Sequence, residues 1–429
     1  MLKRYCKGFY RSQDSEVRNQ SFLFCILYPV FCILFFTGCA GDKVVSSEIK
    51  SLPWKAYLFN NQREGKTEDT MKLPIGSFAD FRIADAAMFK LFIPYDPTEY
   101  SSPAIVDNIV YVGASNKYFY AIDLKNGRVI WEFSTSGAIE SSPTVHNGRV
   151  YFGTGGGILY CLDSKDSREI WRFQAGTEII SSPVVEDDAV YFNSADDKLY
   201  ALKAETGEKL WQYSRRYARK IVKRTFTSPA AHGDKIYCNF TDGYIAAVEK
   251  SSGREVWQKR TLGEGHAGVA RFTPTIKDGL VYLINGDGFL IVMDAENGED
   301  RWMFDIIKIS DFTLSKGYIF AAGYDGSIIA INKSGKIVWR KKVGQGIPVS
   351  IIAADNYVIA ASNYKTDFIF SSATGSYVDI FDMDKGKKVW SENIDSTISA
   401  SMAAAYNHLF LVTDKGYLRV YKSNYSPRD

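Results

Sequence analysis

The sequence is poor in the residues that build disulfide frameworks and metal centres. Of its six cysteines, four lie at or before position 39, so only Cys161 and Cys238 remain in the body of the chain. The four histidines are dispersed, and neither an HExxH nor a CxxC spacing occurs. These absences exclude a disulfide scaffold and a zinc site. We expect both remaining cysteines to be small buried apolar residues.

Signatures of catalysis and of nucleic-acid binding are also missing. The chain has no GxSxG, no Walker A sequence and no dinucleotide-binding fingerprint after a strand. Gly155-Gly156-Gly157 is a turn rather than a phosphate loop, because no helix follows it. Five basic and two acidic residues lie in 1–38, which leaves 47 of each sign in the remainder. The sequence therefore predicts no catalytic residue, no cofactor and no nucleic-acid partner.

The N-terminus has the form of a targeting segment. A basic stretch precedes an apolar run over 22–36, which is shorter than the roughly 20 residues of a membrane helix. The run ends in Thr37-Gly38-Cys39-Ala40, which resembles a bacterial lipobox despite Phe36 where Leu is usual. The resemblance implies a signal peptide over 1–38, lipidation of Cys39 and a linker over 39–50. The alternative is an uncleaved anchor followed by an incidental cysteine.

The rest of the chain repeats with a period near 40. Ser-Ser-Pro recurs at 101–103, 141–143 and 181–183. Tryptophans recur at the same interval and continue beyond it, at Trp131, Trp171, Trp211, Trp257, Trp302, Trp339 and Trp390. A period of this length is typical of propeller blades or of helical-pair repeats.

The first repeat distinguishes between these two architectures. Ser101–Val106, Ile109–Ala114, Tyr118–Asp123 and Val129–Ser134 are short β-rich segments separated by turn residues. No stretch of the repeats sustains a 3.6-residue period, so a helical solenoid is disfavoured. Four strands per unit predict a propeller blade.

The last two strands of each unit share the pattern Ala-x-Asp-x-x-x-Gly-x-x-x-Trp. In the first unit it reads Ala121, Asp123, Gly127 and Trp131. We expect the acid to accept bonds from turn N–H groups and the glycine to take a left-handed conformation. The tryptophan ring is expected to lie against the adjacent blade.

This pattern resembles the quinoprotein-type tryptophan-docking repeat, and the resemblance covers residues 101–421. It implies an all-β fold, an eight-bladed β-propeller of four-stranded antiparallel blades, over 51–429 as a single domain. An eighth unit begins at Ile398, but the chain ends one residue before its tryptophan would occur. We therefore predict that the strand around Trp54 closes the ring as the outer strand of the last blade. All eight tryptophans would then dock; the alternative is an open seven-bladed ring.

Loop lengths indicate which face of the ring is elaborated. The second-to-third-strand loops and the crossings between blades lie on one face, and three of them are long. Asn60–Tyr100 is an insertion, in which Phe78, Phe81, Ala84, Met88 and Leu91 have helical spacing. Asn363–Thr374 lengthens a loop of the seventh blade. The crossing after Trp211 carries a basic group that we predict to bind a protein partner: Arg215, Arg216, Arg219, Lys220, Lys223 and Arg224. The alternative is a solvated loop.

A lipid-anchored ring of this length resembles the BamB-type lipoproteins of the outer-membrane β-barrel assembly machinery. The resemblance implies a non-enzymatic scaffold that binds the barrel-forming core subunit and is anchored at the outer membrane, facing the periplasm. Arg224, five residues before Pro229, matches a contact position of that family. The next crossing carries two acids in the family but none in Val269–Pro274 here.

Two other functions remain as alternatives. One is a periplasmic or surface module that binds another protein or a glycan. The other is a pyrroloquinoline quinone-dependent dehydrogenase. Such enzymes use adjacent cysteines against the cofactor and Ca²⁺ ligands in the central funnel, whereas Cys161 and Cys238 are far apart in this sequence.

Overall fold

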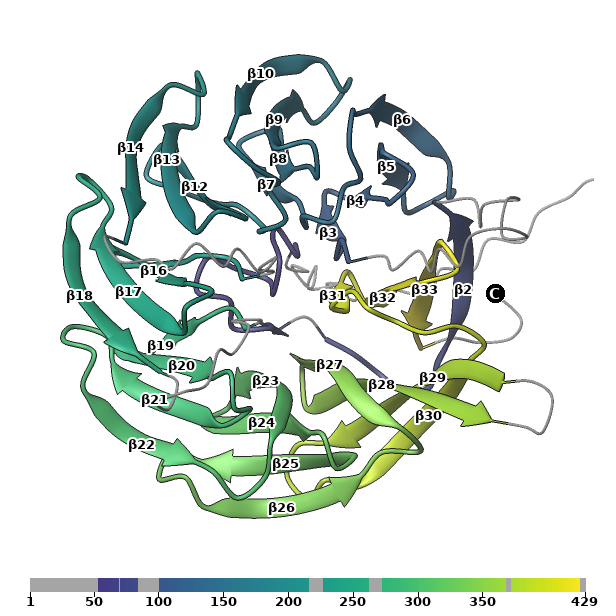
Figure 1. The fold of residues 1–429 in the computed structure, drawn as a ribbon. Coiled ribbons are helices and arrows are strands. Elements are labelled where there is room, and N and C mark those ends of the chain that lie inside the picture. The colour runs from purple at the N-terminus through teal and green to yellow at the C-terminus, as the bar shows by residue number, and fades with distance from the viewer. Residues whose placement is uncertain are drawn as a thin grey trace, which may run out of the picture. The chain divides into compact units, whose positions relative to one another are not determined.

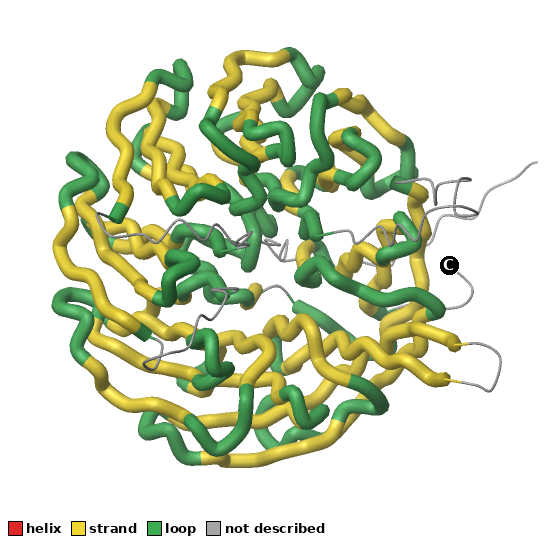
Figure 2. Tube along the Cα trace, viewed as in Figure 1, coloured by secondary structure: helices red, strands yellow, loops and turns green. Residues whose placement is uncertain are grey.

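The structure, a computed structural model, describes residues 53–68, 70–83, 100–215, 227–261, 272–367 and 372–424. All of them belong to one compact unit, Lys50–Asp429. Strands and loops make up these residues, with no helix among them (Figure 2). Within this described part, no helix is long and apolar enough to cross a membrane.

Eight sheets, antiparallel except where Lys66–Thr67 adds a parallel strand to one of them, are arranged in a ring (Figure 1), which confirms the predicted eight-bladed propeller. Blades 1 to 4 comprise β3 (Ala104–Val106), β4 (Ile109–Gly113), β5 (Tyr118–Asp123) and β6 (Val129–Ser134); β7 (Thr144–His146), β8 (Arg149–Gly153), β9 (Ile158–Asp163) and β10 (Glu169–Gln174); β11 (Val184–Glu186), β12 (Ala189–Ser194), β13 (Lys198–Lys203) and β14 (Lys209–Ser214); and β15 (Ala230–His232), β16 (Lys235–Asn239), β17 (Tyr244–Glu249) and β18 (Glu255–Arg260).

Blades 5 to 8 follow the same order, with additions from the N-terminal part of the chain. They comprise β19 (Thr275–Lys277), β20 (Leu280–Ile284), β21 (Leu290–Asp294) and β22 (Asp300–Phe304); β23 (Ile309–Ser315), β24 (Tyr318–Gly323), β25 (Ser327–Asn332) and β26 (Ile337–Lys342); β27 (Ile347–Ala354), β28 (Tyr357–Asp367), β29 (Ser372–Asp382) and β30 (Lys388–Ile394), joined by β1 (Lys66–Thr67); and β31 (Ala403–Ala405), β32 (His408–Thr413) and β33 (Tyr417–Ser423), joined by β2 (Ile75–Arg82).

The turns follow from the residues that the repeat places in them. Asp107 and Asn108 both have positive φ, 53° and 60°, as a two-residue hairpin with the twist of its strands requires. The Asp123 carboxylate accepts the N–H of Lys125 at 2.9 Å, and Gly127 has a φ of 68°. The expected roles of the acid and the glycine are thereby confirmed.

The repeat tryptophans dock each blade on the next one. The Trp171 indole N–H donates to the Ala204 carbonyl at 3.0 Å, and its ring covers Gly207. A Cβ on Gly207 would lie 2.7 Å from that ring, so the close approach also requires glycine there. Equivalent indole N–H bonds to carbonyls of the next blade are donated by Trp131, Trp211, Trp257 and Trp339.

Closure by the N-terminal part of the chain is confirmed, but the predicted strand is wrong. The outer strand of the last blade is β2, which pairs antiparallel with β33 from Ile75↔Ser423 to Arg82↔Tyr417 (Figure 1). Phe81 on β2 covers Gly127, the position that a docking tryptophan covers elsewhere. Phe81 therefore takes the place of the missing eighth tryptophan.

Trp54 has a different position from the one predicted. It is fully buried and forms a bridge with Ile105 on β3, the innermost strand of the first blade. Its ring packs edge-on against Phe59, with ring centroids 5.4 Å apart. Trp54 thus belongs to the centre of the ring, and seven tryptophans rather than eight occupy the docking position of the repeat.

Two further expectations about loops are corrected. Phe78 and Phe81 lie on strand β2, not on a helix, while Ala84, Met88 and Leu91 lie outside the described residues. Asn363–Thr374 is largely strand, because β28 and β29 continue their pairing out to Asp367↔Ser372. The seventh blade therefore carries a long two-stranded hairpin at the edge of the ring (Figure 1).

Candidate functional site: the channel and the loop face

The centre of the ring is occupied by the chain's own N-terminal segment. We call residues 53–67 the strap. Its backbone carbonyls accept N–H bonds from the innermost strands of six blades, at equivalent positions of the repeat. The bonds are Ile105 to Trp54, Val145 to Lys55, Ala231 to Asn61, Ile276 to Gln62, Leu314 to Glu64 and Ala353 to Gly65. The strap thereby joins blades 1, 2, 4, 5, 6 and 7 in chain order.

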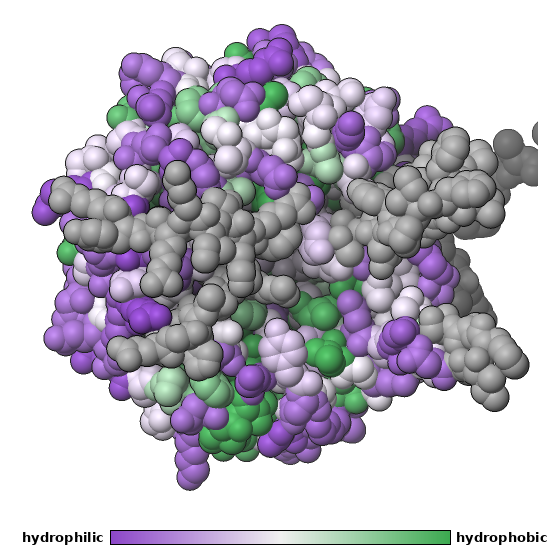
Figure 3. Space-filling model, viewed as in Figure 1, coloured by the Kyte–Doolittle hydropathy of each residue, from purple (hydrophilic) through white to green (hydrophobic). Residues whose placement is uncertain are grey.

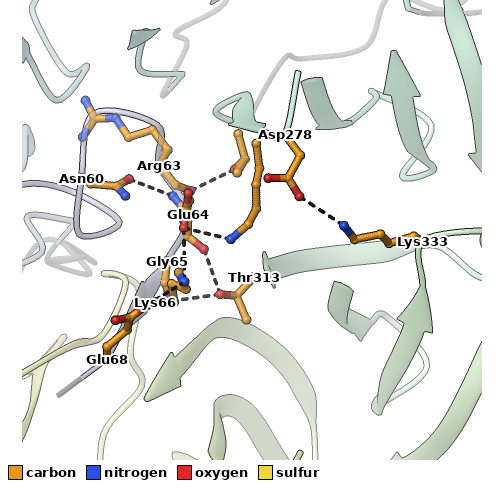
Figure 4. Close-up of polar contacts among 11 residues, drawn as sticks. Asn60, Arg63, Glu64, Gly65, Lys66, Glu68, Asp278, Thr313 and Lys333 are labelled. Atoms are coloured by element: carbon orange, nitrogen blue, oxygen red, sulfur yellow. Dashed lines mark hydrogen bonds and ion pairs between the residues drawn. The ribbon is translucent and has the colours of Figure 1, made fainter. Parts of the chain in front are cut away.

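Side chains reinforce the strap on the side of blades 5 and 6. Thr313 donates its hydroxyl to the carbonyls of Glu64 and Gly65, both at 2.9 Å (Figure 4). The Glu64 carboxylate accepts from the Lys277 ammonium at 3.2 Å. These contacts add side-chain bonds to two strap carbonyls that already accept backbone N–H groups from Leu314 and Ala353.

The side chain of Arg63 places a positive charge among four backbone carbonyl groups. This side chain is 1% exposed and donates to the carbonyls of Tyr57, Ser182, Pro183 and Pro229 at 2.7–3.2 Å. Burial lowers the pKa of the guanidinium to about 9, which is still above neutral pH. A single side chain therefore ties the strap to blades 3 and 4.

Asp311 on β23 is a second ionisable group beside the strap, and it is half-buried. Its two carboxylate oxygens accept the backbone N–H groups of Phe312 at 2.9 Å and Ile351 at 2.8 Å. Burial raises the pKa of Asp311 to about 7, and burial also raises the pKa of Tyr57 near it. Desolvation outweighs the two hydrogen bonds at this carboxyl group.

Asp311 makes the stability of the ring depend on pH. Between about pH 4 and 7 the folded protein keeps a proton that the unfolded chain has released, so the free energy of unfolding should fall as the pH rises. Above pH 7 this contribution should be constant. We expect Asp311→Asn, measured by urea unfolding from pH 5 to 8, to show a shallower fall than the wild type. The exposed Asp384→Asn should keep the wild-type slope; equal slopes for Asp311→Asn and wild type would contradict this assignment.

The basic group predicted to bind a partner is described only at its first member. Arg215 is ion-paired with Asp242 and lies over the Tyr244 ring, 3.4 Å from its centroid. Its Nε donates to Gln258 at 2.9 Å. Arg215 thus connects blades 3 and 4 within the chain, and its side chain is only 7% exposed. Arg216, Arg219, Lys220, Lys223, Arg224 and Cys39 lie outside the described residues.

A polar groove of about 620 Å³ runs between the outer strands β14 and β18 beside Arg215. Gln212, Tyr213, Arg254, Glu255 and Gln258 contribute to its walls. The Tyr213 hydroxyl donates to Glu255 at 2.5 Å across the groove. This groove opens next to the crossing on which the partner prediction falls.

The loops beside this crossing are locked to one another. Asp197 in the loop of blade 3 accepts the backbone N–H and the hydroxyl of Thr241 in the loop of blade 4. Asp196 accepts from Thr177 at 3.2 Å and pairs with Lys198. Polar contacts between loops of neighbouring blades give this part of the face a fixed geometry.

The loop face also exposes apolar side chains that the sequence did not single out. Ile306 in the crossing from blade 5 to 6 is 62% exposed, and Tyr324 and Ile347 are 47% and 45% exposed. Figure 3 shows a mainly hydrophilic surface, with hydrophobic residues gathered in the lower part of the view. The alternation of apolar and polar residues predicts which strand positions are buried. It does not predict which loop side chains are left exposed where adjacent blades meet.

The surroundings of the two cysteines in the repeats make their thiols unreactive. Cys161 and Cys238 are buried free thiols, and burial raises the pKa of both, that of Cys161 to about 12. Within the described ranges, no three His, Cys, Asp or Glu side chains are grouped as metal ligands. Neither thiol therefore offers a reactive thiolate at neutral pH.

Comparison with known families identifies the repeat. The family described as outer membrane protein assembly factor BamB matches residues 115–310 and 325–425, which is more than half of the chain. The chain belongs to the BamB family. BamB of Moranella endobia is 25% identical over 138 residues, 30% of this chain and 36% of that protein. BamB of Yersinia pestis is 26% identical over 136 residues, which are 31% of this chain and 32% of that protein. The matches span about a third of the length of these relatives.

Solved structures agree on the fold. The crystal structure of BamB from Moraxella catarrhalis matches with a TM-score of 0.63 and 17% identity, over 82% of this chain and 99% of that one. The quinohemoprotein alcohol dehydrogenase of Comamonas testosteroni matches with a TM-score of 0.66 and 13% identity, over 87% of this chain and 81% of that one. These identities show a shared fold alone.

The residues at the centre of this ring do not fit a bound quinone. Arg63 of the strap is buried there and Tyr57 is half-buried, and the Arg63 guanidinium already donates to four backbone carbonyls. Cys161 and Cys238 lie on different blades, so no adjacent pair of thiols is present.

Proposed function

We propose that this BamB-family protein is a non-enzymatic, lipid-anchored scaffold that assists the assembly of β-barrel proteins at the outer membrane. The observation that carries the proposal is the family match over most of the repeats. The filled channel supports it, because the ring offers fixed loops on its face rather than a central cofactor site.

We assign partner binding to the loop face at blades 3 and 4. The locked loops around Asp197 and Thr241 and the groove beside Arg215 form a rigid polar frame there. The five basic residues of 216–224 follow Arg215 directly in the chain. Because Arg215 is held by Asp242, the five residues after it carry the proposed contact with a protein partner.

The anchor belongs to the same proposal. Cys39 would carry the lipid after removal of residues 1–38, placing the protein on the periplasmic side of the outer membrane. The strap begins 14 residues later, at Pro53. Anchor and ring closure would thus be adjacent in the chain.

Affinity capture from detergent-solubilised membranes tests this function. We expect the full-length protein to recover the barrel-forming core subunit of the assembly machinery. Reversing the charge of Arg216, Arg219, Lys220, Lys223 and Arg224 to Glu should reduce recovery about tenfold or more, since like charges then face the acceptor surface.

A matched charge reversal controls for net charge. Lys125, Lys165, Lys333, Lys385 and Lys387, in the turns between third and fourth strands on the opposite face, should tolerate change to Glu without loss of capture. Recovery of other proteins only would overturn the proposed function. Equal loss in both variants would overturn the assignment of the surface.

A further inference from the structure

Within the described residues, two of the eight blades, 3 and 8, lack the bond that the strap makes to the other six, and blade 3 is the one that the strap passes in chain order between two bonded blades. In blades 1, 2, 4, 5, 6 and 7 the innermost strand donates one equivalent backbone N–H to a strap carbonyl. Val185 of β11 occupies that position in blade 3, 40 residues after Val145 and in the same register with its neighbouring strand. Its N–H points toward the strap but has no acceptor among the described residues.

The strap makes a turn at the place where this bond is missing. Leu58 and Phe59 have positive φ, 51° and 77°, and Ala56 and Phe59 form an isolated bridge. The turn carries the backbone away from β11, and contact resumes through the Asn61 side chain, whose Nδ2 donates to the Val185 carbonyl at 3.0 Å. The conformation is costly for residues with a side chain, so the interruption is a specific feature of this segment.

A cavity of about 370 Å³ lies where the strap departs from blade 3. This volume is within the range of small-ligand sites. Ala56, Phe59, Val145 and Val185 give it apolar walls. It opens at the end of β7, next to the turn after His146, and therefore on the face opposite the crossings between blades.

The cavity is lined by three side chains that can donate hydrogen bonds, of which Lys55 is exposed and the other two are half-buried. Lys55, Gln62 and His146 line it, and none of their side chains has a hydrogen-bond partner among the described residues. Burial lowers the pKa of His146, and the Lys55 ammonium lowers it further, while Asp188 acts in the opposite direction. With the Val185 N–H, the cavity offers an ammonium, an amide, an imidazole and a backbone donor.

We propose that this cavity binds the carboxylate group of a small ligand with an aliphatic tail. Lys55 and the Val185 N–H hold the carboxylate oxygens, and His146 and Gln62 donate further bonds to them. The aliphatic part lies against Phe59 and Val145. Donors with no internal acceptor favour a negatively charged group, and an apolar wall favours an aliphatic chain beside it.

Calorimetric titration of the full-length protein in detergent tests the proposal. The probes are N-acetyl-leucine and N-acetyl-leucinamide, which differ only in the carboxylate. We expect the acid to bind and the amide to bind about tenfold more weakly or worse, because the amide loses a charge-assisted hydrogen bond. A tripeptide that ends in a leucine carboxylate should bind more tightly than N-acetyl-leucine if the natural ligand is a peptide end, and no more tightly if it is a free acid.

Two variants and one exchange measurement localise the binding. Lys55→Gln should weaken the acid about tenfold, whereas Lys72→Gln, an exposed lysine outside the cavity, should not. Hydrogen exchange of the segment with Val185 should slow when the acid is bound, and that of β19 should not change. Absence of binding, equal binding of acid and amide, or equal effects of the two lysine variants would each overturn the proposal.

Discussion

Replacing Arg63 with methionine should destabilise the ring by about 3 kcal/mol or more. The guanidinium satisfies four carbonyls from the strap and from blades 3 and 4, and within the described part of the chain no carboxylate shares it. Methionine has a comparable volume but no donor, so buried acceptors lose their partners, at about 1–3 kcal/mol each where water cannot enter. Urea unfolding at neutral pH measures the change.

Two further variants separate charge from geometry at this position. Arg63→Lys should retain part of the stability, since an ammonium keeps the charge but lacks the fork of donors that reaches carbonyls on two blades. Arg128→Met, at an exposed turn position, should have little effect. An Arg63→Met protein as stable as the wild type would show that the strap does not hold the ring together.

Replacing Phe81 with alanine should loosen the closure between blades 8 and 1. The ring lies on Gly127, as tryptophan rings lie on Gly207 and Gly253 elsewhere. We expect a loss of about 2 kcal/mol, at the lower end for large-to-small changes because Phe81 is only half-buried. Thermal and urea unfolding measure the loss.

Phe81→Trp provides the matched test of the docking role. This variant places a tryptophan, the docking residue of the other blades, over Gly127. We expect its stability to be close to that of the wild type. Phe78→Ala, on the same strand but 39% exposed, should cost less than Phe81→Ala. If Phe78→Ala and Phe81→Ala were equally destabilising, the closure would depend on the β2–β33 pairing rather than on the docked ring.

The helical interpretation of Phe78 and Phe81 was wrong for a local reason. The two residues are three apart, which suits one helix face, whereas a regular strand alternates with a period of two. A bulge between Ser77 and Ala79 shifts the pairing of β2 with β33 by one residue. The extra residue breaks the alternation, so the sequence pattern of this strand resembles a helix.

The closing strand was misassigned because tryptophan is only one way to cover the glycine. Counting tryptophans led to Trp54, which is buried against Ile105 at the centre of the ring. The residue that does dock is Phe81, and the acid and glycine of the repeat do not precede it at the spacing that they keep before the tryptophans. The strand that pairs with β2, which is β33, and the glycine that Phe81 covers, Gly127, are both distant from it in the chain.

By itself, the sequence determined the blade and the number of blades. Strand alternation, left-handed turn residues such as Gly127 and the spacing of the tryptophans are local properties, and they repeat often enough to be read without a structure. Only the tertiary structure decided that Gly127 must also leave room for the Phe81 ring and that residues 53–67 fill the channel. It also decided that the Arg63 side chain links this segment to blades 3 and 4. These depend on contacts between segments up to more than 300 residues apart, as between Ile75 and Ser423, and no local pattern records which segments will meet.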